Sequence, residues 1–329
     1  GFAPRSVVVP RGEAAKTAAQ LSALWEGLLE AGVQRDTPVV ALGGGAASDA
    51  IGFAAATLLR GVPWVAVPTT LLGMVDAGLG GKTAIDLPQG KNLAGAFAPP
   101  RAVLLDPECL ATLPPGTPPG MAEVLKHALI ADPALWSELG RRAGRGDPRR
   151  ALGADLLLRS ARVKLDCVAE DPFDRGVRRT LNLGHTFAHG LERAADYALS
   201  HGHAVAVGLV AAAAVSEAQG YAEPGLRAEI EAGLERWGLP TRFPARWLPA
   251  AAEALRRDKK ARGEQVEAIL LHEVGCAARA WLPFEALEDG LERVAYSGNS
   301  MSRSDATPVL AASPERSSRS PTAPRLAKP

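Results

Sequence analysis

The strongest chemical signal in this sequence comes from four histidines and one glutamate. His185 and His189 are four residues apart, so a helix would place both imidazoles on one face. His201 and His203 follow in a Ser-His-Gly-His turn, and Glu123 lies upstream in Gly-Met-Ala-Glu. Two imidazoles and a carboxylate with one open position are typical of catalytic zinc. The spacing leaves open whether the pair is His185/His189 or His185/His201, and structural histidines are the alternative.

A glycine turn follows a predicted strand near the start of the chain. Residues 39–42 are apolar, and Gly43-Gly44-Gly45 leads from them into a predicted helix that carries Asp49. Glycines let the backbone approach a pyrophosphate, and a helix N-terminus offers free N–H groups. Because the spacing differs from G-x-G-x-x-G, a tight turn without a ligand is the alternative.

Lysines and arginines recur among glycines and hydroxyl residues. Thr69-Thr70 ends a predicted strand, and a loop-rich stretch with Asp76, Gly-Gly-Lys82-Thr and Gly-Lys91-Asn92 follows. Further polar positions in the second half are Lys164, Arg178, Asn182, Lys259 and Lys260. Lys and Arg suit phosphate and carboxylate groups, although most such residues are solvated surface charges. We expect Lys164 and Arg178 to face an anionic substrate as unpaired, mutually repelling charges.

The elements that position these residues change character along the chain. The first hundred residues alternate predicted strands (6–10, 38–42, 63–68, 102–105) with predicted helices (13–31, 49–60), which indicates a parallel sheet. Predicted helices then dominate (121–130, 152–169, 186–195, 205–219), with one late strand at 266–271. We expect an α/β domain over residues 1–107 and a helical domain over residues 108–290. The Ser/Pro/Arg-rich residues 291–329 are expected to be disordered.

Composition excludes several classes of protein. A net charge of +1 over 329 residues disfavours nucleic acid or an anionic membrane as the main partner. The three cysteines are widely spaced and indicate neither a disulfide framework nor a cysteine-ligated metal. No run of 18 apolar residues occurs, and the first residues lack the pattern of a signal peptide. We therefore expect a cytoplasmic protein.

Taken in order, these segments resemble the 3-dehydroquinate synthase family of sugar-phosphate cyclases. The resemblance covers roughly residues 7–285 and rests on ordered motifs: GGG with Asp49, VPTTLL, GGKT, GKNL, TLP, MAEV, LNLGHT, His189, His-Gly and DKK. It implies an NAD-binding α/β domain, a helical metal-binding domain and a homodimer. It also implies conversion of the seven-carbon keto-acid sugar phosphate DAHP to 3-dehydroquinate and phosphate in the shikimate pathway, as a lyase that uses NAD and Zn²⁺ (or Co²⁺).

The resemblance also implies a role for each matched position. For NAD it implies contacts from Glu13, Lys16, Gly43, Gly44, Gly45, Asp49, Thr69, Thr70, Lys91, Thr112 and Leu113. For the metal it implies Glu123, His185 and His201. For catalysis it implies His189 as a proton-transfer group, with Lys82, Lys164 and Asp174. For the substrate it implies Asp76, Lys82, Asn92, Lys164, Arg178, Asn182, Lys259 and Lys260, and Arg60 reaching the neighbouring subunit.

Some positions depart from the family pattern. His203 stands where the family usually has Glu, and Asp174 replaces another Glu. The opening strand and helix of the nucleotide domain have no counterpart at the start of this sequence, which predicts NAD binding weaker by about 1–3 kcal/mol. The alternatives are a sister cyclase (2-deoxy-scyllo-inosose or 2-epi-5-epi-valiolone synthase), a polyol dehydrogenase and an inactive truncated homologue.

Overall fold

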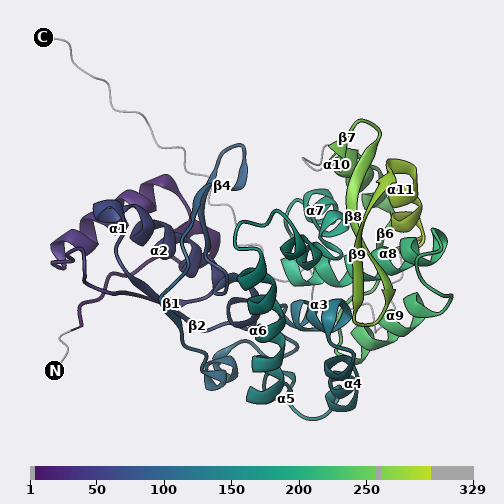
Figure 1. The fold of residues 1–329 in the computed structure, drawn as a ribbon, viewed down its shortest axis with the longest axis horizontal. Coiled ribbons are helices and arrows are strands. Elements are labelled where there is room, and N and C mark those ends of the chain that lie inside the picture. The colour runs from purple at the N-terminus through teal and green to yellow at the C-terminus, as the bar shows by residue number, and fades with distance from the viewer. Residues whose placement is uncertain (1–3, 257–260, 298–329) are drawn as a thin grey trace, which may run out of the picture.

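The first part of the chain is built on a small parallel sheet. The computed structural model describes residues 4–256 and 261–297. Strands β1 (Val39–Gly43), β2 (Trp64–Pro68) and β5 (Ala102–Val103) pair in the order β1-β2-β5, all parallel. Helices α1 (Ala18–Glu30) and α2 (Gly45–Thr57) lie above these strands in Figure 1. Their apolar side chains form a core with alternate residues of β1 and β2, as a βα pattern requires.

Two predicted elements of this part are absent or divided in the structure. Residues 6–10 form no strand. The predicted helix 13–31 is divided into a 3-10 turn, Gly12–Ala15, and α1. The division has a local cause, since the Thr17 side chain accepts a hydrogen bond from the Gln20 N–H and so caps a new helix.

A β-hairpin occupies the stretch that was predicted to be loop-rich. Strands β3 (Lys82–Leu87) and β4 (Gly90–Phe97) pair antiparallel, and the hairpin projects from the sheet in Figure 1. The prediction was wrong because the glycines serve close approach within the pair. A Cβ on Gly95 would lie 2.2 Å from the Thr83 carbonyl oxygen.

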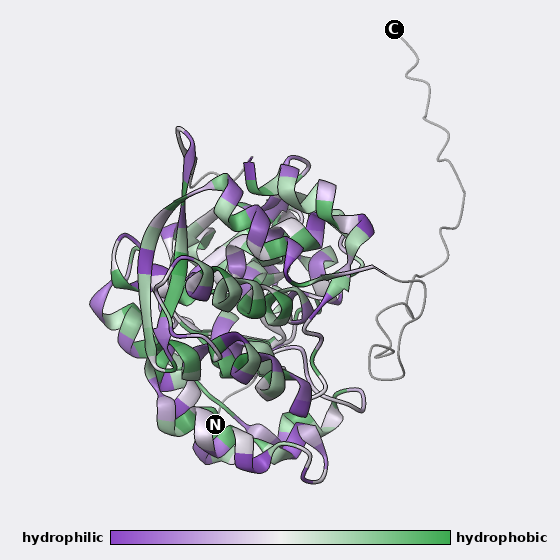
Figure 2. Cartoon of the chain, turned by 90° about the vertical axis from the view of Figure 1, so that its right-hand side faces the viewer, coloured by the Kyte–Doolittle hydropathy of each residue, from purple (hydrophilic) through white to green (hydrophobic). Residues whose placement is uncertain are grey.

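The second part is helical, as predicted. Its helices are α3 (Met121–Ala131), α4 (Pro133–Arg142), α5 (Pro148–Ala151), α6 (Gly153–Glu170), α7 (His185–Ala194), α8 (His201–Ala218), α9 (Leu226–Arg236), α10 (Leu248–Arg256) and α11 (Phe284–Glu292). Figure 2 shows hydrophobic ribbon gathered in its interior. Helix α8 is long and apolar enough to span a membrane, yet 78% of that stretch is buried inside the protein, which identifies it as the core helix.

The start of α8 lies four residues before the predicted one. The Ser200 side chain accepts a hydrogen bond from the His203 N–H and caps the helix, so His201 is its first residue. The apolar period alone begins at residue 205 and does not reveal this turn. The N-cap therefore brings both His201 and His203 into the helix.

Short strands complete the second part. Strand β8 (Gln265–Glu273) contains the predicted strand 266–271 and pairs antiparallel with β7 (Ala261–Arg262) and with β9 (Cys276–Pro283), which the sequence did not reveal. Strands β6 (Phe243–Pro244) and β10 (Ala295–Tyr296) pair parallel. Ordered structure thus continues past residue 290, where the tail was predicted to begin, because Leu291 and Val294 are buried. Residues 298–329 lie outside the described part of the chain.

Glycines let the backbones of α7 and α8, and the residues that precede them, approach closely. A Cβ on Gly208 would lie 2.2 Å from the Gly184 carbonyl oxygen, and one on Gly202 would lie 1.9 Å from the Pro119 carbonyl oxygen. Gly184 also has a φ of +77°, a conformation that glycine adopts without strain. These contacts fix the position of the N-terminus of each helix, where His185 and His201 lie.

We predict opposite effects for two glycine-to-alanine substitutions in helices. G208A forces a methyl group into the Gly184 carbonyl and should lower the free energy of unfolding by about 1–3 kcal/mol. G140A in α4 meets only the Arg236 guanidinium, at 3.4 Å, and should raise it by about 0.4–1 kcal/mol. Urea unfolding of both variants measures the difference, and equal effects would contradict the close-approach argument.

Candidate active site

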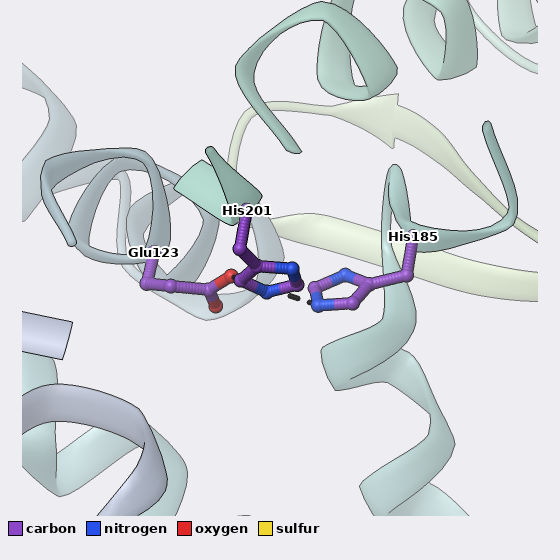
Figure 3. Close-up of side chains that lie close together, drawn as sticks. All are labelled: Glu123, His185 and His201. Carbon is purple, nitrogen blue, oxygen red and sulfur yellow. Dashed lines mark ion pairs between the residues drawn. The ribbon is translucent and has the colours of Figure 1, made fainter. Parts of the chain in front are cut away.

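Three side chains from three helices converge in the second part. Glu123 lies on α3, and His185 and His201 are the first residues of α7 and α8. Their ligand atoms all lie within 4.8 Å of one another. The Nε2 atom of each histidine is 3.6 Å from Glu123 Oε1. Figure 3 shows the three side chains lying together. Carboxylate oxygen and imidazole nitrogen atoms therefore face one common point.

The Glu123 carboxylate is fully buried, and only one of its two oxygens has a hydrogen-bond partner. Its Oε2 atom contacts the Lys126 ammonium group, whereas Oε1 has no hydrogen-bond partner. Burial raises the pKa of this carboxyl, but Lys126 and the two imidazoles outweigh burial and hold the pKa well below its usual range. An ionised, unsatisfied oxygen beside two imidazole nitrogens is the donor set of a catalytic zinc site, so these residues fit a divalent metal.

The geometry distinguishes between the two pairs that the spacing left open. Among the described residues, Glu123 and His185 share a group of possible metal ligands with His201. Neither His189 nor His203 belongs to that group. The His189 ring lies beside the group, with its centroid 5.8 Å from that of His185. His203 does not line the cavity beside the group, and burial lowers its pKa.

A cavity of about 1180 Å³ lies between the two parts of the chain beside these residues. The first part lines it with Glu13, Lys16, Gly45, Asp49, Asp76, Lys82, Lys91 and Asn92. The second part lines it with Lys164, Thr186, His189, Glu192, Tyr197 and His201. Predicted site residues from both parts of the chain therefore share one space, at the carboxyl end of the parallel strands.

The dinucleotide side of the cavity is formed by the start of α2. Gly45 and Ala46 line the cavity, so the first N–H groups of this helix, which lack intrahelical partners, face it. Ser48 Oγ, in the same turn, is buried without a partner. The positive end of the helix and its free donors fit an anionic pyrophosphate. Gly43 and Gly44 precede this turn.

Other residues predicted to contact NAD have partners within the protein. Lys16 is buried, with Nζ 2.7 Å from Asp49 Oδ2 and in contact with the Asn92 side chain. The Thr70 hydroxyl accepts from the Gly73 N–H, and the Thr112 hydroxyl donates to the Cys109 carbonyl. Thr69, Thr70, Thr112 and Leu113 do not line the cavity.

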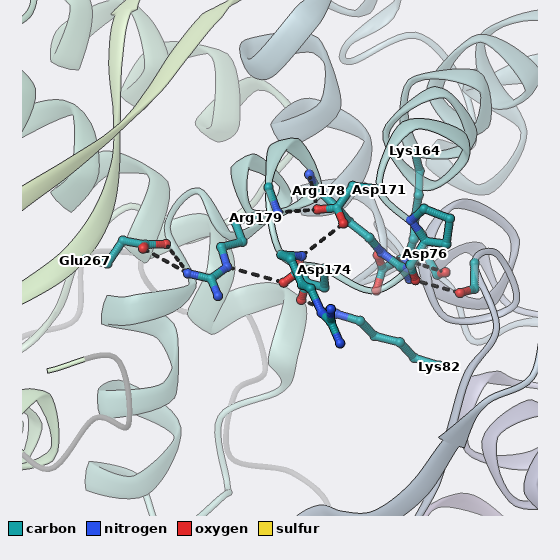
Figure 4. A network of polar contacts seen from close by, with 12 residues as sticks. Asp76, Lys82, Lys164, Asp171, Asp174, Arg178, Arg179 and Glu267 are labelled. Atoms are coloured by element: carbon teal, nitrogen blue, oxygen red, sulfur yellow. Dashed lines mark hydrogen bonds and ion pairs between the residues drawn. The ribbon is translucent and has the colours of Figure 1, made fainter.

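The expectation of unpaired cations was wrong. Lys164 Nζ pairs with the Asp76 carboxylate and lies 2.6 Å from the Asp76 carbonyl oxygen. Arg178 donates to the Pro172 and Gly80 carbonyls at 2.8 and 3.0 Å, and Lys82 Nζ is 2.6 Å from Asp174 Oδ2 (Figure 4). Distance in the sequence concealed the partners Asp76, Asp174 and Gly80, which lie 88 to 98 positions from the cations that they contact.

The remaining predicted residues lie away from the cavity or beyond the described chain. Asn182 ends the 3-10 turn Val177–Asn182 and does not line the cavity. Arg60 ends the turn Leu58–Arg60 after α2 with a φ of +69°; it is exposed and does not line the cavity. Lys259 and Lys260 lie outside the described residues, so their roles stay predictions.

Sequence reasoning missed three side chains of the site. Lys126 is three residues after Glu123, a helical spacing that could have revealed their contact. Glu192 is seven residues after His185 and accepts from His201 Nδ1 at 3.4 Å. The Tyr197 ring lies under Lys91 Nζ, 5.0 Å from the ring centroid, and no sequence pattern predicts that contact between the two parts.

Comparison with known proteins agrees with this geometry. Residues 6–117 match the family described as 3-dehydroquinate synthase N-terminal, and residues 120–261 match the one described as 3-dehydroquinate synthase C-terminal. The chain belongs to the 3-dehydroquinate synthase family. It is 43% identical to the 3-dehydroquinate synthase of Geobacter metallireducens over 281 residues, 84% of this chain and 77% of that protein.

Two solved structures show the same two-part architecture as this member of the 3-dehydroquinate synthase family. One is 2-epi-5-epi-valiolone synthase from Streptomyces hygroscopicus subsp. jinggangensis with NAD⁺ and Zn²⁺ bound (TM-score 0.78, 28% identity, 87% of this chain and 81% of that chain). The other is 2-deoxy-scyllo-inosose synthase with carbaglucose-6-phosphate, NAD⁺ and Co²⁺ (TM-score 0.77, 26% identity, 86% and 81%). The predicted family and fold class are thus confirmed.

We predict that substitutions at the convergent group abolish metal binding. E123Q, H185A and H201A each remove one of three donors, so the purified chain should no longer hold a stoichiometric equivalent of Zn²⁺. H189A is the control, because His189 lies outside the ligand group and should leave the metal in place. Metal analysis after dialysis provides the measurement, and loss of metal in H189A but not in H201A would contradict the assignment.

We also predict that the buried pair of Lys164 and Asp76 supports stability. Burial raises the pKa of Asp76, but Lys164 outweighs it and holds the pKa below its usual range. K164M leaves this carboxylate unpaired and should cost about 3 kcal/mol in the free energy of unfolding at pH 7.

The pH dependence and a surface pair serve as controls for K164M. The contribution of the pair is present above the unfolded pKa of about 4 and lost as the pH falls toward the folded pKa, so the difference from the unsubstituted protein should shrink in acid. R256M breaks an exposed pair with Glu288 and should cost much less than K164M, because solvent screens the charges of an exposed pair. Urea unfolding from pH 3 to pH 7 compares the variants, and a pH-independent difference would exclude the ion pair as the cause.

Proposed function

We propose that this chain is a 3-dehydroquinate synthase that converts DAHP to 3-dehydroquinate and phosphate, as a step of the shikimate pathway. The observation that carries the proposal is the convergence of Glu123, His185 and His201 beside one cavity, which His201 lines together with the start of α2. A metal and a dinucleotide held on one cavity suit a reaction in which an alcohol is oxidised before a leaving group departs. The relative from Geobacter metallireducens carries the name of this enzyme.

The cofactors of the proposed reaction are NAD and a divalent metal, Zn²⁺ or Co²⁺. When bound, NAD accepts and later returns a hydride, and the metal lowers the pKa of alcohol oxygens and polarises the carbonyl. In the proposal, Glu123, His185 and His201 hold the metal. Glu13, Lys16, Gly43–Gly45, Asp49, Thr69, Thr70, Lys91, Thr112 and Leu113 serve NAD, directly or by shaping its site.

The chain's own residues perform the proton and anion chemistry. His189 lines the cavity one helical turn after His185, where its imidazole can take a proton from the carbon next to the new ketone. Lys82, Lys164 and Asn92 place cations and an amide in reach of the phosphate and carboxylate of the substrate. Asp76 and Asp174 orient Lys164 and Lys82 through their ion pairs. Arg178, Asn182, Lys259 and Lys260 complete the proposed anion set.

Assembly and location belong to the same proposal. We propose a soluble cytoplasmic homodimer in which Arg60 of one subunit reaches the substrate of the other. The exposed turn at Arg60, away from the cavity of its own subunit, supports that role. We also propose that residues 1–107 and 108–290 act as separate nucleotide and metal domains, with the cavity between them.

A sister cyclase is the second candidate function. Both solved structures of similar fold are sister cyclases, and one holds carbaglucose-6-phosphate. The identity to them is 28% and 26%, against 43% for the Geobacter synthase, so the acid substrate is favoured. Lys164, Arg178 and Asn182 also suit a substrate carboxylate better than a neutral sugar hydroxyl.

Direct assay tests the proposed function. The purified chain with Zn²⁺ and NAD should release phosphate from DAHP and form 3-dehydroquinate without net formation of NADH, because the hydride returns within the turnover. Glucose 6-phosphate is the matched substrate for the sister reaction and should give no product. H189N should keep its metal and lose about 10²-fold or more in turnover. Product from glucose 6-phosphate and none from DAHP would replace the proposal with the sister cyclase.

A further inference from the structure

Glu192 extends the line of site residues along α7. His185, His189 and Glu192 are at positions i, i+4 and i+7, so all three lie on one face of the helix. The Glu192 side chain lines the cavity and is 13% exposed. It lies in the last turn of α7, where the helix dipole disfavours a carboxylate, so its placement depends on a cationic or donor partner.

That partner is the histidine on the neighbouring helix. Glu192 Oε1 is 3.4 Å from Nδ1 of His201, whose Nε2 atom faces Glu123 Oε1 at 3.6 Å. A histidine that binds metal through Nε2 keeps its proton on Nδ1, and that N–H donates to the carboxylate. Glu192 therefore selects the tautomer and the ring orientation that direct Nε2 toward the common point.

The other imidazole of the group has a different support. Nδ1 of His185 lies 3.2 Å from the Leu183 carbonyl oxygen, while its Nε2 atom also faces Glu123 at 3.6 Å. A neutral carbonyl and an ionised carboxylate are unequal acceptors, because charge-assisted hydrogen bonds are the stronger. The donor strength of the two histidines toward a cation is therefore unequal, and His201 is the stronger donor.

Charge balance gives Glu192 a second effect. Near the group lie the carboxylates of Glu123, Asp76 and Glu192 and the ammonium groups of Lys126 and Lys164. The Glu192 carboxylate adds a negative charge beside the imidazole of His201, and that charge attracts a cation held by the group. The low dielectric of the interior strengthens this attraction for a divalent ion.

We propose that Glu192 is a positioning residue that orients His201 and strengthens its bond to the catalytic metal. The inference rests on the proposed metal group of Glu123, His185 and His201. Glu192 contacts Nδ1 of His201 and would not bind the metal itself.

The test is the affinity of the metal-free chain for Zn²⁺, measured by titration against a competing chelator. E192Q keeps the shape of the side chain and removes its charge, and should weaken Zn²⁺ binding by about tenfold or more. The visible absorption of the Co²⁺-loaded protein should shift as well. E229Q is the matched control, because Glu229 also accepts from a ring N–H, that of Trp136 at 2.9 Å, away from the cavity. E229Q should bind Zn²⁺ within twofold of the unsubstituted chain.

A second variant keeps the test decisive if E192Q does not fold. E192D retains the charge but withdraws the carboxylate from a contact that is already 3.4 Å long, so it too should weaken Zn²⁺ binding. Unchanged affinity in E192Q or in E192D would overturn the inference. Failure of the proposed metal group is distinguishable, because E123Q and H201A would then bind Zn²⁺ as tightly as the unsubstituted chain.

Discussion

The structure of the site depends on the burial of one carboxylate. A charged Glu123 in the interior would be strongly unfavourable without compensation. Lys126 neutralises one of its oxygens, and two imidazoles face the other. Three helices therefore begin close to one place, and the glycine contacts around α7 and α8 allow their backbones to come close enough. The close packing of these helices therefore also sets the positions of the three metal-ligand side chains.

The two parts of the chain meet through polar contacts beside the cavity and through apolar packing next to it. Lys82 pairs with Asp174, Lys164 with Asp76, and Arg178 donates to the Gly80 carbonyl. Leu71, Met74 and Val75 of the first part are buried in the core of the helical part. The ion pairs leave charged groups near the cavity for an anionic ligand. The groups that hold the parts together are those that the proposed function requires for substrate, so stability and binding are coupled at these positions.

Much of the fold followed from local patterns. The apolar period of α3, α6 and α7 predicted these helices within a few residues, and the β-branched runs predicted β1 and β2. The β3–β4 hairpin was missed because its strands contain glycines that read as loop, although those glycines serve close strand contact. Strand β9 was missed because its alanines carry little β signal, and its pairing with β8 supplies the stability. Both failures concern pairing with another segment, which a local pattern does not contain.

The sequence by itself determined the family, because the family's motifs occur in the same order along most of the chain and can be recognised without a structure. It also determined the set of residue types: imidazoles with a glutamate for a metal, glycines before a helix for a dinucleotide, and lysines for anions. Only the tertiary structure decided which histidines share a point with Glu123, and that Lys164 and Lys82 are paired rather than unpaired. The physical reason is distance. Partners such as Lys82 and Asp174 lie 92 positions apart in the chain, and only packing brings them within 2.6 Å.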